Sequence, residues 1–245
     1  MNNNGSAGSS DDTILGITSP SDWCLHDNII TLPKLNHFGW KYDESDRSVD
    51  ANFMDLAYRL ARNSYCVEGN MGCVYVRGIP QGSGQAAGPT APRGTIVAES
   101  INSALVQRFH SECHAEANAV SACCRHGVSL AGTTCYVTRA PCTNCYRLIA
   151  TAGVSRIVCP HDPASENCTE SARKLGIEWI KLSPTNNELR IRDEEASKYE
   201  DTDRIQLLRK ERKIVREEAK IKSRKRKAER QRELEQKQRL KMHTE

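Results

Sequence analysis

The sequence has no long apolar run and few aromatic side chains. Only 5% of its 245 residues are aromatic, and its mean hydropathy is -0.61. A membrane-spanning helix needs about 20 consecutive apolar residues, which this chain lacks. Residues 1–12 have neither a basic start nor an apolar stretch, so a secretory signal is not expected. The composition therefore predicts an intracellular protein, in the cytoplasm or the nucleus, with no membrane partner.

Cysteine, in contrast, is abundant, with eleven residues. An odd number of cysteines in a chain without an export signal indicates reduced thiols and metal ligands rather than a framework of disulfides.

The net charge of +4 is unevenly distributed. Residues 204–245 contain 17 Lys and Arg against 7 Asp and Glu, a balance of +10, whereas residues 1–203 carry -6. Gly and Pro are absent from residues 204–242, and Leu207, Ile214 and Ile221 recur every seven residues. The companion apolar position of a heptad is mostly missing, so the pattern predicts a long exposed helix and at best a weak coiled coil.

Three interpretations of this basic tail remain open. It is a solvated helix without a partner, a nuclear-import signal at Lys222–Lys227, or a non-specific binding surface for nucleic acid. Because no aromatic residue follows Arg204, binding to nucleic acid would depend on charge rather than on base stacking.

Changes in the pattern of apolar and polar residues along the chain divide it into four segments. We expect a disordered N-terminus at 1–20, an extension at 21–48, an α/β domain at 49–184 and a basic helical tail at 185–245. Within the domain, strands are expected near residues 72–76, 95–98, 134–138, 155–159 and 177–182. Helices are expected near residues 49–61, 114–125, 142–152 and 166–175. Such alternation is typical of a sheet with helices covering its faces.

Two short motifs predict a catalytic zinc site. A catalytic zinc ion takes three nitrogen or sulfur ligands and leaves a fourth position for water. His114, Cys142 and Cys145 supply that set. The two cysteines lie at the start of a predicted helix, where the backbone dipoles stabilise thiolates.

Glu116 lies two residues after the predicted ligand His114. We interpret it as a general acid and base that moves protons, not as a ligand. The two motifs in this order, His-x-Glu and then Pro-Cys-x-x-Cys, form the signature of zinc-dependent nucleobase deaminases. The alternative is a structural zinc site, which would need a fourth protein ligand.

From about residue 49 to residue 182 the sequence resembles the cytidine/deoxycytidylate deaminase superfamily, and most closely its deoxycytidylate deaminases. The resemblance is carried by the stretches His-Ala-Glu-Ala-Asn-Ala-Val at 114–120, Tyr-Val-Thr at 136–138, Ile-Ala-Thr-Ala-Gly-Val-Ser-Arg-Ile-Val at 149–158 and Lys-Leu-Gly-Ile at 174–177. It implies a three-layer fold with a five-stranded mixed sheet, a nucleotide substrate and a homo-oligomer.

The resemblance also implies that Asn102, Ala115 and Pro141 contact the substrate. Around Asn102 the sequence departs from the family, because residues 100–105 read Ser-Ile-Asn-Ser-Ala-Leu where a Tyr-Asn-Gly segment is usual. A turn-capping amide is therefore an equal alternative for Asn102.

The leading functional hypothesis is hydrolysis of dCMP to dUMP. A nucleic-acid deaminase, such as one that converts adenosine to inosine in tRNA, is the alternative favoured by the basic tail. An inactive subunit of a deaminase complex is the third, although such subunits commonly lose the acid that Glu116 supplies. Some nucleotide deaminases of this type hold a second, structural zinc, for which Cys66, Cys73 and His110 are the candidates.

Overall fold

The computed structural model describes residues 24–26, 29–31, 35–45, 47–79, 93–107, 109–200 and 202–242. The chain divides into two compact units, Met1–Glu200 and Asp201–Glu245. The disorder expected for residues 1–20 lies outside the described residues. None of the described helices is both long and apolar enough to cross a membrane.

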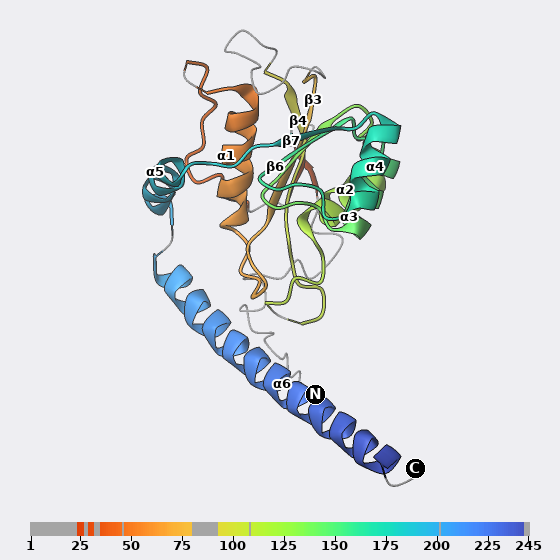
Figure 1. The fold of residues 1–245 in the computed structure, drawn as a ribbon. Coiled ribbons are helices and arrows are strands. Elements are labelled where there is room, and N and C mark those ends of the chain that lie inside the picture. The colour runs from red at the N-terminus through yellow and green to blue at the C-terminus, as the bar shows by residue number, and fades with distance from the viewer. Residues whose placement is uncertain are drawn as a thin grey trace, which may run out of the picture. The chain divides into compact units, whose positions relative to one another are not determined.

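A seven-stranded mixed sheet forms the centre of the first unit, in the order β1-β2-β4-β3-β5-β6-β7 (Figure 1). β3 pairs antiparallel with β4 and with β5, whereas β6 pairs parallel with β5 and with β7. The strands are β1 Cys24–His26, β2 Ile29–Thr31, β3 Gly72–Arg77, β4 Thr95–Ile101, β5 Thr134–Val137, β6 Arg156–Cys159 and β7 Glu178–Lys181.

The five strands expected between residues 49 and 182 are all present, which confirms the predicted fold class. The sheet is larger than expected because β1 and β2 extend it beyond β4. Each of these strands has three residues, too few for an alternation of apolar and polar side chains to be recognised.

Helices cover both faces of the sheet and give three layers (Figure 1). On one face lies α1 (Val49–Ala61), with α5 (Asn186–Ser197) beside it. On the other face lie α2 (Ala115–Arg125), α3 (Thr143–Thr151) and α4 (Glu166–Leu175). A buried apolar cluster fills the space between each helical layer and the sheet.

α1 lies unusually close to β3. A Cβ atom at Gly72 would stand 2.1 Å from the carbonyl oxygen of Ala57, so only glycine fits at this position. Next to this contact, the ring of Phe53 on α1 packs against that of Tyr136 on β5, with centroids 5.3 Å apart. Burial of these side chains joins α1 to the middle of the sheet.

The first unit continues past residue 184, where the sequence suggested that the domain ends, because ion pairs hold α5 to α1. Asp55 of α1 accepts hydrogen bonds from Arg192 at 2.5 Å and from Arg59 at 2.8 Å. Arg59 also donates to Glu195 of α5 at 2.5 Å. Asp55, Arg59 and Arg192 are all buried. Apolar periodicity does not reveal a contact made by charged side chains.

The second unit is a single helix, α6 (Thr202–Met242), which has 41 residues. The sequence predicted a helix over 204–242, and the structure confirms it. Leu207, Ile214 and Ile221, the residues of the heptad pattern, are each more than half exposed. A helix that is polar on nearly all sides has no broad apolar stripe with which to pack into a core.

Candidate active site

His114 lies at the N-terminal cap of α2, in an extended backbone conformation with φ -75° and ψ 153°. Its side chain makes no capping hydrogen bond, which leaves the imidazole available to other partners. The first turn of α2 is fixed to the sheet, because the Ser100 hydroxyl at the end of β4 donates to the Ala115 carbonyl at 2.7 Å. The strand therefore sets the position of the imidazole.

The two cysteines lie at the start of α3. Cys142 is the N-cap, and its sulfur accepts a hydrogen bond from the backbone amide of Cys145 at 3.5 Å. Pro141, just before the cap, is buried. Three residues make almost one helical turn, so the Cys-x-x-Cys spacing brings both sulfurs to the same end of the helix.

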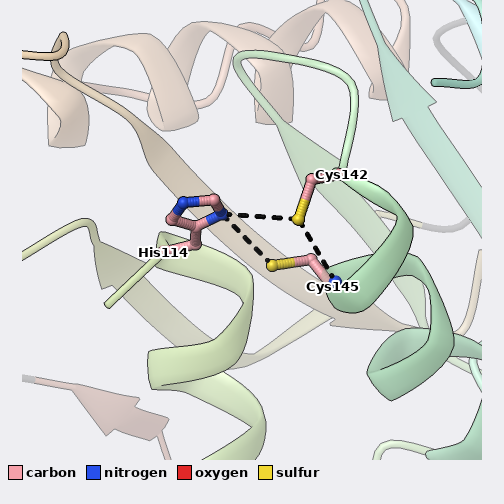
Figure 2. A group of neighbouring side chains, drawn as sticks. All are labelled: His114, Cys142 and Cys145. Atoms are coloured by element: carbon pink, nitrogen blue, oxygen red, sulfur yellow. Dashed lines mark hydrogen bonds between the residues drawn. The ribbon is translucent and has the colours of Figure 1, made fainter. Parts of the chain in front are cut away.

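The three predicted ligands come together (Figure 2). His114 Nδ1 is 3.7 Å from Cys142 Sγ and 3.4 Å from Cys145 Sγ. In a tetrahedral zinc site, bonds of about 2.3 Å to sulfur and about 2.0–2.1 Å to nitrogen would put these atoms about 3.6 Å apart. The spacing and the chemistry of the donors therefore both fit zinc. Within the described part of the chain, no other group of three such ligand atoms gathers.

Glu116 lies in the first turn of α2 and is 5% exposed. Burial raises the pKa of its carboxyl, against the opposing effects of a backbone hydrogen bond, the nearby His114 and a hydrogen bond with Cys145. A carboxyl group with a raised pKa accepts and returns protons more readily near neutral pH. The arrangement supports the predicted role in proton transfer, and Glu116 is not one of the three gathered ligands.

The charges at this site favour a bound cation. Burial, followed by the neighbouring Glu116 and Cys142, raises the pKa of the Cys145 thiol. Two sulfurs and a carboxylate so close together repel one another when ionised. A divalent metal ion reverses this effect, because it stabilises coordinating thiolates.

Asn102 is buried and makes three hydrogen bonds with its own chain. Its Oδ1 accepts from the Met71 amide at 2.8 Å, and its Nδ2 donates to the Gly69 carbonyl at 2.8 Å and to the Ser111 hydroxyl at 2.9 Å. These contacts fit an amide that joins two loops. The substrate contacts expected of Asn102, and of the buried Ala115 and Pro141 beside the ligands, remain predictions.

The three residues suggested for a second zinc do not gather. Cys66 Sγ donates to the Asn102 carbonyl at 3.7 Å, and Cys73 Sγ is 3.6 Å from Cys135 Sγ. His110 Nδ1 instead lies 2.8 Å from Glu68 Oε1. The described side chains thus give this second site no support.

Sequence reasoning missed Glu112 and Asn118. Glu112 Oε2 accepts hydrogen bonds from the three backbone amides of residues 105–107, at 2.6–3.0 Å, and so orders the loop that leads to His114. Asn118 on α2 donates to the Ile101 carbonyl at 2.8 Å and to the Ser103 hydroxyl at 3.0 Å. Glu112 contacts the loop before His114, and Asn118 contacts the residues where that loop begins. Such contacts can be seen only in the folded chain.

Comparison with known proteins identifies relatives of this chain. A profile of the cytidine and deoxycytidylate deaminase zinc-binding region matches residues 47–161. The chain is 36% identical to the deoxycytidylate deaminase of Mycobacterium phage D29 over an alignment of 126 positions, which covers 46% of this chain and 94% of the phage protein. It is also 36% identical to the deoxycytidylate deaminase of Enterobacteria phage T2 over an alignment of 78 residues, which covers 31% of this chain and 42% of that protein.

Among solved structures, the dCMP deaminase of cyanophage S-TIM5 in its apo form is similar. It is 21% identical, with a TM-score of 0.43, and the match covers 55% of this chain and 97% of the phage chain.

Proposed function

Because the chain belongs to the cytidine and deoxycytidylate deaminase family, and is thus a hydrolytic deaminase, we propose that its substrate is dCMP, which it converts to dUMP and ammonia. The observation that carries this proposal is the group formed by His114, Cys142 and Cys145 beside the buried Glu116. The deoxycytidylate deaminase of phage D29, aligned over 94% of its length, supports the choice of substrate.

His114, Cys142 and Cys145 would hold zinc, which when bound supplies a Lewis acid that lowers the pKa of water. The remaining steps belong to Glu116. Its carboxylate takes a proton from the water that attacks C4 of the cytosine ring and passes it to the ring nitrogen N3. It then returns a second water proton to the exocyclic amine, the C4–N bond breaks, and ammonia leaves. The product keeps the water oxygen as the C4 carbonyl.

Burial prepares Glu116 for this double role. The carboxyl must be ionised when the water attacks and protonated when the amine leaves, so its pKa should lie nearer neutrality than that of an exposed glutamate. The burial that raises the pKa of Glu116 acts in this direction.

A substrate panel tests the proposal. The zinc-loaded protein is incubated with dCMP, dCTP, cytidine, single-stranded DNA and tRNA, and release of ammonia is followed together with chromatography of the products. We expect the highest kcat/KM for dCMP. Deamination confined to tRNA or DNA would replace the proposal with a nucleic-acid deaminase, and no turnover of any compound would indicate an inactive subunit.

A further inference from the structure

One stretch of α6, which we call the basic segment, runs from Lys220 to Arg232. It contains eight Lys and Arg residues and one acidic residue, Glu229. All thirteen side chains are exposed. Lys220 forms an ion pair with Glu217 at 2.7 Å. Between Lys222 and Lys227, no cation is paired with an acidic side chain that the structure describes, so these charges are available to a partner.

The cations of the basic segment surround the helix rather than marking one side of it. An α-helix turns by about 100° per residue. Six of the cations therefore form two trios, centred about 180° apart. The first trio is Lys220, Arg224 and Lys227. The second trio is Lys222, Lys225 and Arg226. A partner that lies flat against the helix would meet only one trio, whereas a partner that encloses the helix meets both.

This distribution discriminates between polyanions. A helix that lies on an anionic membrane needs an apolar face, and the basic segment has only Ile221 and Ala228 as apolar residues. Single-stranded nucleic acid is bound through aromatic stacking, and no aromatic residue follows residue 204. The major groove of duplex RNA is deep and narrow, so an α-helix does not fit into it. The major groove of B-form DNA, about 12 Å wide, does admit an α-helix.

We propose that the basic segment lies in the major groove of double-stranded DNA and contacts phosphates of both strands without reading the sequence. Its thirteen residues cover about 18 Å of helix, alongside which a DNA duplex carries about ten phosphates. The first trio faces the phosphates of one strand and the second trio those of the other. This binding does not depend on the deaminase site or on its substrate.

The test measures how the full-length protein binds a fluorescent 20-base-pair DNA duplex of arbitrary sequence between 50 and 200 mM salt. If the six cations of the two trios neutralise about six phosphates, the logarithm of the binding constant falls with the logarithm of salt with a slope of about -5.4. This corresponds to about a 1,800-fold loss of affinity across that range. Two variants replace either the first or the second trio with glutamine, a residue that favours helices about as well.

We expect each trio variant to make the slope shallower by about 2.7, and both to lose affinity to a similar extent. The matched control replaces three exposed cations of the first unit, Arg173, Lys174 and Arg190, with glutamine and removes the same charge. It should bind within about twofold of the wild type. Circular dichroism checks that α6 remains helical. The charge-preserving variant Lys222→Arg/Lys225→Arg should bind like the wild type.

Several outcomes would overturn the proposal. Loss of affinity in only one trio variant would show one-sided contact instead of groove binding. Equal loss in the control would show that only the total charge matters. Binding to single-stranded DNA, to duplex RNA or to vesicles of anionic phospholipid that is as tight as binding to duplex DNA would identify a different partner.

Discussion

The guanidinium of Arg156 on β6 donates two parallel hydrogen bonds to the carboxylate of Asp50 at the start of α1, at 2.6 and 2.5 Å. Both side chains are buried. The Tyr136 hydroxyl donates to the same carboxylate at 2.8 Å, and Arg156 Nε donates to Glu178 at 3.0 Å. This network connects the sheet to α1, the helix that covers one face of the sheet.

Breaking this pair is expected to destabilise the protein strongly. Asp50→Asn removes the charge that accepts two hydrogen bonds from the buried guanidinium of Arg156 and leaves Glu178 as its remaining acidic partner. We expect a loss of about 3–5 kcal/mol in the free energy of unfolding. Urea denaturation measures this loss in the free energy of unfolding. Glu194→Gln, which removes the exposed partner of Arg190, serves as the control and should cost less than about 1 kcal/mol. A similar small cost for both variants would contradict the expectation.

Zinc content tests the three ligands. Cys142→Ala and Cys145→Ala should each reduce bound zinc from about one ion per chain to almost none, and should lower Tm, because the metal joins the starts of α2 and α3. Metal analysis and thermal denaturation measure the two effects. Cys124→Ala changes an exposed thiol outside the ligand group and should leave both unchanged. Wild-type protein that takes up no zinc would refute the interpretation of the site.

Glu116→Gln should separate chemistry from metal binding. The amide keeps the size of the side chain but cannot move protons, so kcat should fall by about 10²–10⁴-fold while zinc remains bound. Steady-state assays and metal analysis together measure this. Glu170→Gln, on the exposed surface of α4, is the control. Activity of Glu116→Gln within a few-fold of the wild type would mean that another group transfers the protons.

Asn102→Ala distinguishes a structural role from a role in binding the substrate. The substitution leaves the Gly69 carbonyl and the Met71 amide without their partner, so we expect a loss of about 1–3 kcal/mol in stability. Denaturation curves and KM are measured for the same protein. A large rise in KM at unchanged stability would instead support the substrate contact implied by the family.

The α1–α5 ion pairs predict sensitivity to acid. Burial favours protonated Asp55, but Arg192 and Arg59 outweigh it and hold the pKa of Asp55 below its ordinary 3.8. A carboxyl with a depressed folded-state pKa contributes stability that is complete above its unfolded pKa and lost as the pH falls through the folded pKa. Wild-type stability should therefore decline below about pH 4, in part through Asp55.

Asp55→Asn should be less stable than the wild type at pH 7, but its stability should fall less steeply below about pH 4. Denaturation at a series of pH values measures the slope. An equally steep fall in the variant would assign the acid sensitivity to other carboxyls.

The parts of the fold that the sequence predicted depend on local signals. The helix ending at Leu175 and the strand from Thr95 show periodic apolar residues bounded by polar or glycine residues, and the structure has both elements. The spacing of Cys142 and Cys145 likewise predicts that both sulfurs lie at one helix end. These signals are contained within about ten residues, which is why they can be read without the fold.

The parts that were missed depend on contacts between distant segments. Asp50 and Arg156 are 106 residues apart, and nothing near either residue indicates the other. The attachment of α5 through Arg192 could not be recognised, because a charged residue on a helix is ordinarily exposed. The hydrogen bonds of Glu112 and Asn118 to the loop before His114 need the folded positions of β4 and α2.

The outermost strand, β7, also has a consequence for how copies of this chain associate. In the described sheet its free edge is a potential template for a strand of another molecule. Glu178 pairs with Arg156, and Lys181 lies 2.6 Å from Asp162, so charged groups lie along this short strand. Such charges discourage edge-to-edge aggregation. Self-association of this protein is therefore expected to use its helical faces rather than to lengthen its sheet at β7.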